Sequence, residues 1–202
     1  MSTVMIAQDG QPRCQWCSAA PEFIRYHDEE WGFPVDDDVR LFEKLCLESF
    51  QSGLSWRTIL AKRENFRTAF HHFDFSKVAE FTDQDIERLL QNAGIVRHRG
   101  KIEAVINNAK RARELVQQEG SLAAYIWRYE PDPEPVSPPQ TISTSPESTA
   151  LSKDLKKRGW KFVGPTTVYA FMQAMGLVND HAAECIMRAQ VASARAQFKR
   201  PE

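Results

Sequence analysis

The chain has 202 residues, of which 42% are hydrophobic, 26 are basic and 27 are acidic. This composition excludes disordered, collagen-like and disulfide-dense proteins, and the length predicts one domain or two small domains packed together. The formal net charge of −1 provides no general attraction to nucleic acid, so any nucleic-acid binding must depend on local charge.

The chain shows no signal for a membrane or for secretion. No apolar run approaches the roughly 20 residues of a transmembrane helix, and residues 1–13 lack the features of a signal peptide. We therefore expect a cytoplasmic protein without membrane contact. In that reducing compartment the four cysteines are expected to be thiols or metal ligands rather than disulfides.

Helical periodicity runs through most of the chain, and strand-like alternation is scarce. Helix starts are predicted at Asp36–Asp38 and Ser55, and Thr82 with Asp85 forms a capping box for another helix. Residues 101–118 place their apolar side chains on one stripe. The expected fold class is all-α.

Residues 130–149 break the helical pattern with six of the eleven prolines and no aromatic residue. This composition predicts an extended surface loop. We expect a disordered N-terminus at 1–12, a body at 13–186 and a C-terminal tail at 187–202. The body includes the loop and, at about 150–176, a unit of two helices joined by a hairpin.

The hairpin unit has the pattern of a phosphate-binding site. Its first helix is expected to run to about Arg158 and to stop at Gly159, and Pro165 can occupy the first position of the second helix. Turn amides and a helix N-terminus would then both face outward toward anions. The alternative is a solvated helix followed by an ordinary turn. Five basic side chains favour the first interpretation: Lys153, Lys156, Lys157, Arg158 and Lys161.

Two groups of cysteine and histidine, far apart in the sequence, indicate a metal site. Cys14, Cys17 and His27 lie near one end, and His181 and Cys185 lie four residues apart near the other. On a helix, the last two side chains reach one point. Two thiolates and two imidazoles would form a closed, structural zinc site that joins the chain ends. The spacing leaves Cys14 paired with either Cys17 or His27, and the plainer alternative is that these residues are unrelated.

Glu48 falls on the apolar face of its helix, where a carboxylate is costly unless it is bonded or used. Together with nearby aromatic rings, it suits a planar ligand held by stacking and by edge hydrogen bonds. Gly53 and Leu54 follow in a turn whose apolar tip could enter between bases. The simpler alternatives are a solvated glutamate, core aromatics and local packing. The aromatic residues are Trp16, Phe23, Tyr26, Trp31 and Trp56.

Several strings, in order, resemble the DNA-3-methyladenine glycosylase I family. They are YHDEEWG (26–32), LFEKLCLESFQSGLSW (41–56), KRENF (62–66), AGIVRHRGKI (93–102), KKRGWKFVGP (156–165) and GLVNDH (176–181). The similarity runs from about Cys14 to Cys185. It implies a bacterial-type, all-α helix-hairpin-helix DNA glycosylase: a helical bundle whose N- and C-terminal regions are joined by structural zinc, with no redox cofactor.

The resemblance also implies an activity. The expected enzyme is a monomer that flips 3-methyladenine out of alkylated double-stranded DNA and hydrolyses its N-glycosidic bond. An abasic site and free 3-methyladenine are the expected products. Strand cleavage is not expected, because no lysine stands where Schiff-base chemistry can be argued. Two other classes are weighed against this: a DNA-structure binder that has lost its chemistry, and a zinc deaminase, whose H-x-E and P-C-x-x-C strings are missing.

The family's functional residues carry over by position. The zinc ligands fall on Cys14, His27, His181 and Cys185, which makes Cys17 a departure from the family pattern. Glu48 becomes the catalytic and base-reading acid. The other expected base contacts are Tyr26, which bonds the base edge, Trp56, which stacks, and Trp16 and Trp31, which line the pocket. The expected DNA contacts are Gly53 and Leu54 in the gap-filling loop, and Gly159, Lys161 and Gly164 in the hairpin.

One expected charge is missing. Related helix-hairpin-helix glycosylases place a catalytic aspartate where this chain has Asn179. A neutral amide cannot stabilise an oxocarbenium-like transition state by its charge. Since alkylation at N3 makes adenine a cationic and good leaving group, catalysis can depend on extruding and gripping the damaged base. Asp180 is the neighbouring alternative if the register shifts.

Overall fold

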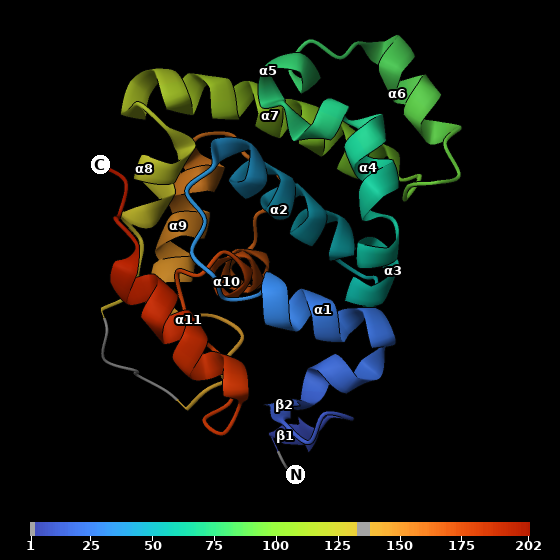
Figure 1. Cartoon of the computed structure of the whole chain (residues 1–202). Coiled ribbons are helices and arrows are strands. Elements are labelled where there is room, and N and C mark those ends of the chain that lie inside the picture. Colours follow the sequence, from blue (N-terminus) through green and yellow to red (C-terminus); the bar gives the residue numbers. More distant parts are fainter. Residues whose placement is uncertain (1–2, 133–137) are drawn as a thin grey trace.

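The computed structural model describes residues 3–132 and 138–202. Within these ranges the chain is mostly helical, as predicted, and a short sheet precedes the helices (Figure 1). The elements are β1 (Val4–Ile6), β2 (Pro12–Cys14), η1 (Gln15–Ala19), α1 (Pro21–Glu29), α2 (Asp38–Gln51), α3 (Trp56–Ala61), α4 (Arg63–Ala69), η2 (His71–Phe73), α5 (Phe75–Val78), α6 (Asp83–Leu90), α7 (Arg99–Glu119), α8 (Leu122–Trp127), α9 (Pro146–Lys157), α10 (Pro165–Ala174) and α11 (Ile186–Gln197).

A two-stranded sheet stands where we expected a disordered N-terminus at 1–12. β1 pairs antiparallel with β2, with Val4 opposite Cys14. Arg13 stabilises this hairpin, because its guanidinium bonds Asp9 at 2.8 Å and Asp28 of α1 at 2.9 Å. Residues 1–2 lie outside the described residues. The sheet thus holds Cys14 against α1.

The three predicted helix starts are confirmed. Asp37 accepts a hydrogen bond from the Arg40 amide at the start of α2, and Ser55 accepts one from the Thr58 amide at the start of α3. Thr82 and Asp85 form the capping box of α6. This helix ends at Leu90. These starts depend on bonds within one helical turn, which the sequence shows directly.

Helix α2 is the central element, and α3, α7, α8 and α10 pack against it (Figure 1). Every residue from Leu41 to Phe50 is buried, including two carboxylates, a lysine and a serine. Buried polar groups need partners. Glu43 has Arg67 at 2.7 Å, and the Ser49 hydroxyl donates to the Phe162 carbonyl of the hairpin at 2.9 Å. Through these two bonds, α4, which carries Arg67, and the hairpin, which carries Phe162, are held against α2.

The hairpin unit has the predicted order of elements. α9 starts at Pro146, a few residues earlier than expected, because Ser145 and Ser148 form a capping box. It ends before Gly159, whose φ of +84° suits glycine, and α10 begins at Pro165. Part of the expected loop at 130–149, residues 133–137, lies outside the described residues.

Two asparagines of α7 hold the hairpin turn. Asn108 accepts a bond from the Lys161 amide at 2.8 Å and donates to the Lys161 carbonyl at 2.9 Å. The Asn107 amide donates to the Gly159 carbonyl at 2.8 Å. These side chains satisfy backbone amide and carbonyl groups of the turn, so α7 fixes the orientation of the hairpin.

The expected C-terminal tail is a docked helix, α11. Val191 is fully buried, and the Phe198 ring contacts Trp127 with centroids 4.5 Å apart. Arg195 pairs with Glu130 at 2.8 Å.

Across the described ranges, no helix is both long and apolar enough to cross a membrane.

Candidate functional site

Cys14, His27, His181 and Cys185 meet in one buried cluster. Their candidate ligand atoms all lie within 4.8 Å of one another. His27 Nε2 lies 3.2 Å from His181 Nδ1 and 3.4 Å from Cys185 Sγ. His181 Nδ1 lies 3.6 Å from Cys14 Sγ and 3.5 Å from Cys185 Sγ. β2, α1 and the segment that leads into α11 supply these groups, so the cluster joins the two chain ends.

These distances fit a tetrahedral metal site. Bonds of about 2.3 Å to sulfur and about 2.0 Å to nitrogen place ligand atoms of a tetrahedron roughly 3.3–3.8 Å apart. The nitrogen–nitrogen distance and three of the nitrogen–sulfur distances in the cluster are 3.2–3.6 Å, and all the candidate ligand atoms lie within 4.8 Å of one another. The residues therefore fit a metal ion bound by two thiolates and two imidazoles.

The surrounding bonds orient both imidazoles for a metal. His27 Nδ1 lies 2.7 Å from the Asp28 carboxylate, and His181 Nε2 lies 3.0 Å from the Trp31 carbonyl. If each of these nitrogens carries the proton, the opposite nitrogen presents its lone pair to the cluster. Cys14 Sγ accepts bonds from the Ala182 amide at 3.3 Å and from the Gln140 side chain at 3.1 Å, as suits a thiolate.

Cys17 lies outside the cluster. Its thiol donates to the Cys14 carbonyl at 3.0 Å. Burial raises the pKa of Cys17 to about 11, so it remains a protonated thiol at neutral pH. Of the two pairings that the spacing left open, the structure brings Cys14 together with His27.

Five of the six residues predicted to hold a planar ligand, Glu48 among them, line one pocket of about 310 Å³. The sixth, Phe23, is buried against Trp16 and is not among the lining residues. η1, α1, α2, α3 and α10 surround the pocket, together with the described part of the proline-rich loop. Its lining is Trp16, Tyr26, Trp31, Glu48, Gln51, Trp56, Gln140, Ile142, Ala170 and Gln173. The indole nitrogens of Trp16 and Trp56 are buried and have no hydrogen-bond partner among the described residues. Two donors are thus available next to the pocket.

Lys44, which the sequence analysis missed, binds three groups of the pocket wall. Its Nζ lies 2.7 Å from Glu48 Oε1 and 2.7 Å from the Tyr26 hydroxyl. It also lies 3.5 Å from the ring centroid of Trp56. Burial lowers the pKa of Lys44, and the Glu48 carboxylate opposes that shift. The available signal was the spacing, because Lys44 precedes Glu48 by four residues on one helix.

Asp180 forms hydrogen bonds with two residues that line the pocket, Gln140 and Gln173. Its carboxylate accepts a bond from the Gln140 amide at 2.8 Å and another from the Gln173 side chain. Burial raises the pKa of this carboxyl. Asn179 is turned elsewhere: its side-chain nitrogen donates to the Arg188 carbonyl at 2.9 Å. Asp180 therefore contacts two pocket residues, whereas Asn179 is not among the lining residues.

The predicted gap-filling loop and the hairpin both connect to one end of α2. Gly53 has a φ of +78°, with open space where a side chain would begin, and Leu54 is 42% exposed. Lys101 of α7 donates to the carbonyls of Phe50 and Ser52 and so holds the start of this loop. The loop thereby has an exposed apolar tip on a fixed base.

The basic group of the hairpin unit has four available charges instead of five. Arg158 pairs with Asp154 at 2.9 Å and with Glu119 at 2.8 Å, so it serves the fold. No ion pair is found within residues 3–132 and 138–202 for the exposed lysines Lys153, Lys156, Lys157 and Lys161. The predicted DNA contacts Gly159 and Lys161 are exposed, and Gly164, the N-cap of α10, is half-buried.

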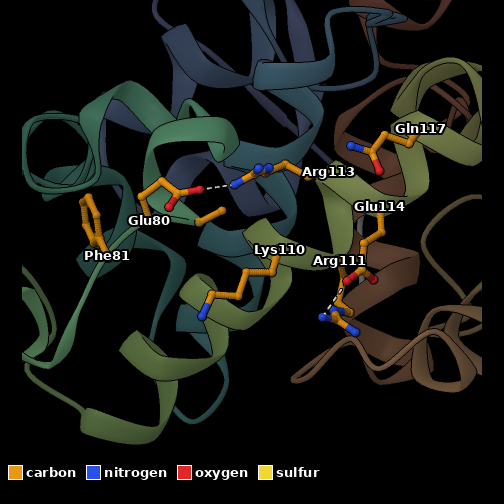
Figure 2. A pocket seen from close by; sticks show the side chains of 8 residues that line it. Glu80, Phe81, Lys110, Arg111, Arg113, Glu114 and Gln117 are labelled. Carbon is orange, nitrogen blue, oxygen red and sulfur yellow. Dashed lines mark hydrogen bonds and ion pairs between the residues drawn. The ribbon is translucent and has the colours of Figure 1, made fainter.

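A larger hollow of about 470 Å³ has none of the predicted site residues in its lining (Figure 2). It lies between residues 79–81 and α7, and Figure 2 shows its arginines engaged with carboxylates: Arg113 with Glu80, and Arg111 with Glu114. The chemistry-bearing residues gather in the smaller pocket next to the cluster.

Fold and site together define a mostly helical protein with a buried Cys/His cluster, an aromatic pocket that contains Glu48, and a basic hairpin. Residues 16–189 match the family described as methyladenine glycosylase. DNA-3-methyladenine glycosylase 1 of Escherichia coli is 51% identical over 177 residues, which cover 86% of this chain and 95% of that protein. DNA-3-methyladenine glycosylase of Haemophilus influenzae is 48% identical, with 86% and 96% covered.

Solved structures agree with these similarities. A crystal structure of 3-methyladenine DNA glycosylase I superimposes with a TM-score of 0.81 at 50% identity and covers 86% of this chain and 98% of its own. A variant of such an enzyme in complex with 3-methyladenine has a TM-score of 0.82 at 39% identity, with 87% and 97% covered. The chain belongs to the methyladenine glycosylase family, whose members are hydrolases of N-glycosyl compounds.

Substitution within the cluster tests the ligand set. Replacing Cys14, His27, His181 or Cys185 by alanine should release a bound metal ion and lower the melting temperature, because metal-binding free energy contributes to folding free energy. Metal analysis of purified variants measures the release. Cys17→Ser is the matched control and should keep the metal. A metal-free Cys17→Ser protein beside a metal-loaded His27→Ala protein would contradict the assignment.

Proposed function

We propose that this protein flips 3-methyladenine out of alkylated double-stranded DNA and excises it by hydrolysis, leaving an abasic site. The observation that carries the proposal is the convergence of Glu48, Tyr26 and Trp56 on one aromatic pocket. The named relatives and the complex with 3-methyladenine support it. We further propose that the enzyme acts as a monomer in the cytoplasm.

The pocket supplies what an extruded base needs. Aromatic faces replace the stacking that the base loses on leaving the helix, and the free oxygen of Glu48 accepts hydrogen bonds from the base edge. Glu48 Oε1 is engaged by Lys44, and no partner of the second oxygen is found in the described parts of the chain. The acid is thus held in place with one acceptor available.

The lesion itself supplies much of the driving force for bond cleavage. Methylation at N3 makes the base cationic, so the electron pair of the bond between N9 and C1′ passes easily to the base. Water adds to C1′ and gives up a proton to solvent, and the base leaves neutral. Asn179 cannot stabilise the sugar cation by charge, and its side chain bonds the Arg188 carbonyl instead. In this mechanism no catalytic aspartate is needed, because the enzyme acts on a base whose glycosidic bond is already weak.

DNA contacts follow from the two exposed elements. In this proposal Leu54, which is exposed on its Gly53 turn, fills the gap that the extruded base leaves. The hairpin from Gly159 to Gly164, with the Lys161 ammonium, binds backbone phosphates. Because the Ser49 hydroxyl of α2 bonds the Phe162 carbonyl at 2.9 Å, the hairpin and the pocket helix are physically coupled.

We propose zinc as the metal of the cluster. Two thiolates and two imidazoles at tetrahedral spacing suit zinc and leave no position for a water ligand. Zinc bound by Cys14, His27, His181 and Cys185 would hold the chain ends and the pocket wall in place and take no part in bond cleavage. Neither the flipping of the base nor hydrolysis needs a redox cofactor.

Base reading is tested with Glu48→Gln. This change keeps the side-chain shape but removes a charge-assisted bond worth roughly 1.5–3 kcal/mol, so 3-methyladenine excision should fall by roughly 10- to 100-fold. Single-turnover release from methylated DNA, followed by chromatography of the free base, measures this. Affinity for free 3-methyladenine should fall as well, since the contact precedes bond cleavage. Unchanged binding and excision would remove Glu48 from the site.

Phosphate binding is tested with Lys161→Gln. Removing one ammonium should weaken binding to damaged and undamaged DNA equally, and should reduce the salt dependence by about one phosphate contact. Titration of fluorescent duplexes at several salt concentrations measures both effects. Arg158→Gln is the matched control, because its charge is already paired within the fold. A loss confined to damaged DNA would place Lys161 in base recognition.

A further inference from the structure

Lys44 is a buried lysine whose ammonium lies among three of the proposed base-binding residues. Its side chain is only 7% exposed. An ammonium has three hydrogen-bond donors and no acceptor. In this position the three donors have three candidate partners: a carboxylate oxygen of Glu48, the hydroxyl of Tyr26 and the ring face of Trp56. The charge is thus desolvated and fully partnered.

The chemistry of the ammonium determines the direction of each bond. Since Lys44 can only donate, the Tyr26 oxygen must accept at their 2.7 Å contact. The hydroxyl proton of Tyr26 is then left for another acceptor. Glu48 uses one oxygen for Lys44 and keeps the other as an acceptor. The pocket therefore presents one donor and one acceptor on neighbouring groups.

We propose that Lys44 is a positioning residue that fixes the hydrogen-bond polarity of the pocket, so that Tyr26 donates and Glu48 accepts when a base edge enters. This rests on the proposed function, because it concerns how the same pocket selects its base. In this role Lys44 determines the direction of the hydrogen bonds of Tyr26 and Glu48, in addition to packing in the pocket wall.

This polarity matches the edge of adenine. Adenine presents an amino donor next to a ring-nitrogen acceptor, whereas guanine presents two acceptors at the corresponding edge. The amino group of adenine suits the free oxygen of Glu48, and its ring nitrogen suits the Tyr26 proton. The carbonyl oxygen of guanine would face the Glu48 carboxylate without a proton between them, at the cost of an unpaired buried acceptor.

Without Lys44, the same two residues would satisfy each other. The Tyr26 and Glu48 oxygens both lie 2.7 Å from the Lys44 nitrogen, so they are neighbours. Removal of the ammonium frees the Tyr26 proton to turn toward the carboxylate, which is the strongest acceptor nearby. The pocket would then lose the donor that reads the ring nitrogen.

A double-mutant cycle on binding of free 3-methyladenine tests the proposal. With Lys44 present, Tyr26→Phe should weaken binding about five- to tenfold, the value of one net hydrogen bond. In the Lys44→Met background the same change should cost less than about twofold. Calorimetry measures the four affinities. Lys62→Met, which removes an ammonium bonded to the Ala93 carbonyl outside the pocket, is the control and should leave the Tyr26→Phe loss unchanged.

A second readout separates polarity from packing. The ratio of affinities for 3-methyladenine and 3-methylguanine should narrow by about fivefold in Lys44→Met, whereas a purely structural defect would weaken both bases alike. An unchanged ratio, or an equal Tyr26→Phe loss in both backgrounds, would overturn the proposal.

The variant Lys44→Met leaves Glu48 buried without its partner and is at risk of not folding. The cycle is therefore repeated on Glu48→Gln and on Glu48→Gln combined with Lys44→Met, where no unpaired carboxylate remains and the amide oxygen at position 48 is the acceptor to which the Tyr26 proton can turn. Loss of the Tyr26→Phe effect only when Lys44 is removed supports the proposal, and equal effects contradict it. If the unmodified protein neither binds nor releases 3-methyladenine, the proposed function fails first; if it does both, only the role of Lys44 is at stake.

Discussion

The two ends of the chain meet in one buried cluster of two thiols and two imidazoles, and the pocket is built against that cluster. His181 bonds the Trp31 carbonyl, and Gln140 bonds the sulfur of Cys14. Trp31 and Gln140 are also pocket walls. A group that never touches the ligand thus positions two residues that line its site, so we regard the cluster as part of the recognition apparatus as well as the fold.

The central helix imposes the second constraint. α2 is buried along most of its length, yet it carries Glu48 and Lys44 at adjacent turns. A buried ion pair contributes little net stability over apolar residues of similar volume, so its presence on a core helix is not explained by stability. The proposed base reading gives it a role, because that role needs charges whose positions do not change when the ligand enters. In the proposed reaction, the weak glycosidic bond of the lesion leaves little further chemistry for the protein.

The sequence predicts well whatever depends on neighbours within one helical turn. The caps at Asp37 and Ser55 and the stop at Gly159 are of this kind. The choice of His27 over Cys17 required the family resemblance, since both spacings allow a ligand. Long-range pairs were not predictable: the bond between Asn108 and the hairpin joins residues 53 apart, and Arg13 reaches Asp28 across a turn and a helix start. Lys44 lies four residues before Glu48 on α2, but its other two partners, Tyr26 and Trp56, come from α1 and α3, and their approach could not be predicted from spacing.

The claim that the cluster positions the base pocket is tested most directly by one comparison of affinities. Free 3-methyladenine is titrated into metal-loaded and metal-stripped protein, both shown to be folded, while the indole N–H resonances of Trp16 and Trp56 are followed. We expect base binding to weaken by about tenfold or more on metal removal, since a pocket displaced by about 1 Å loses its aligned contacts. We also expect both indole signals to shift before any base is added. Equal affinities, with the indole signals unmoved, would show that the cluster does not position the pocket.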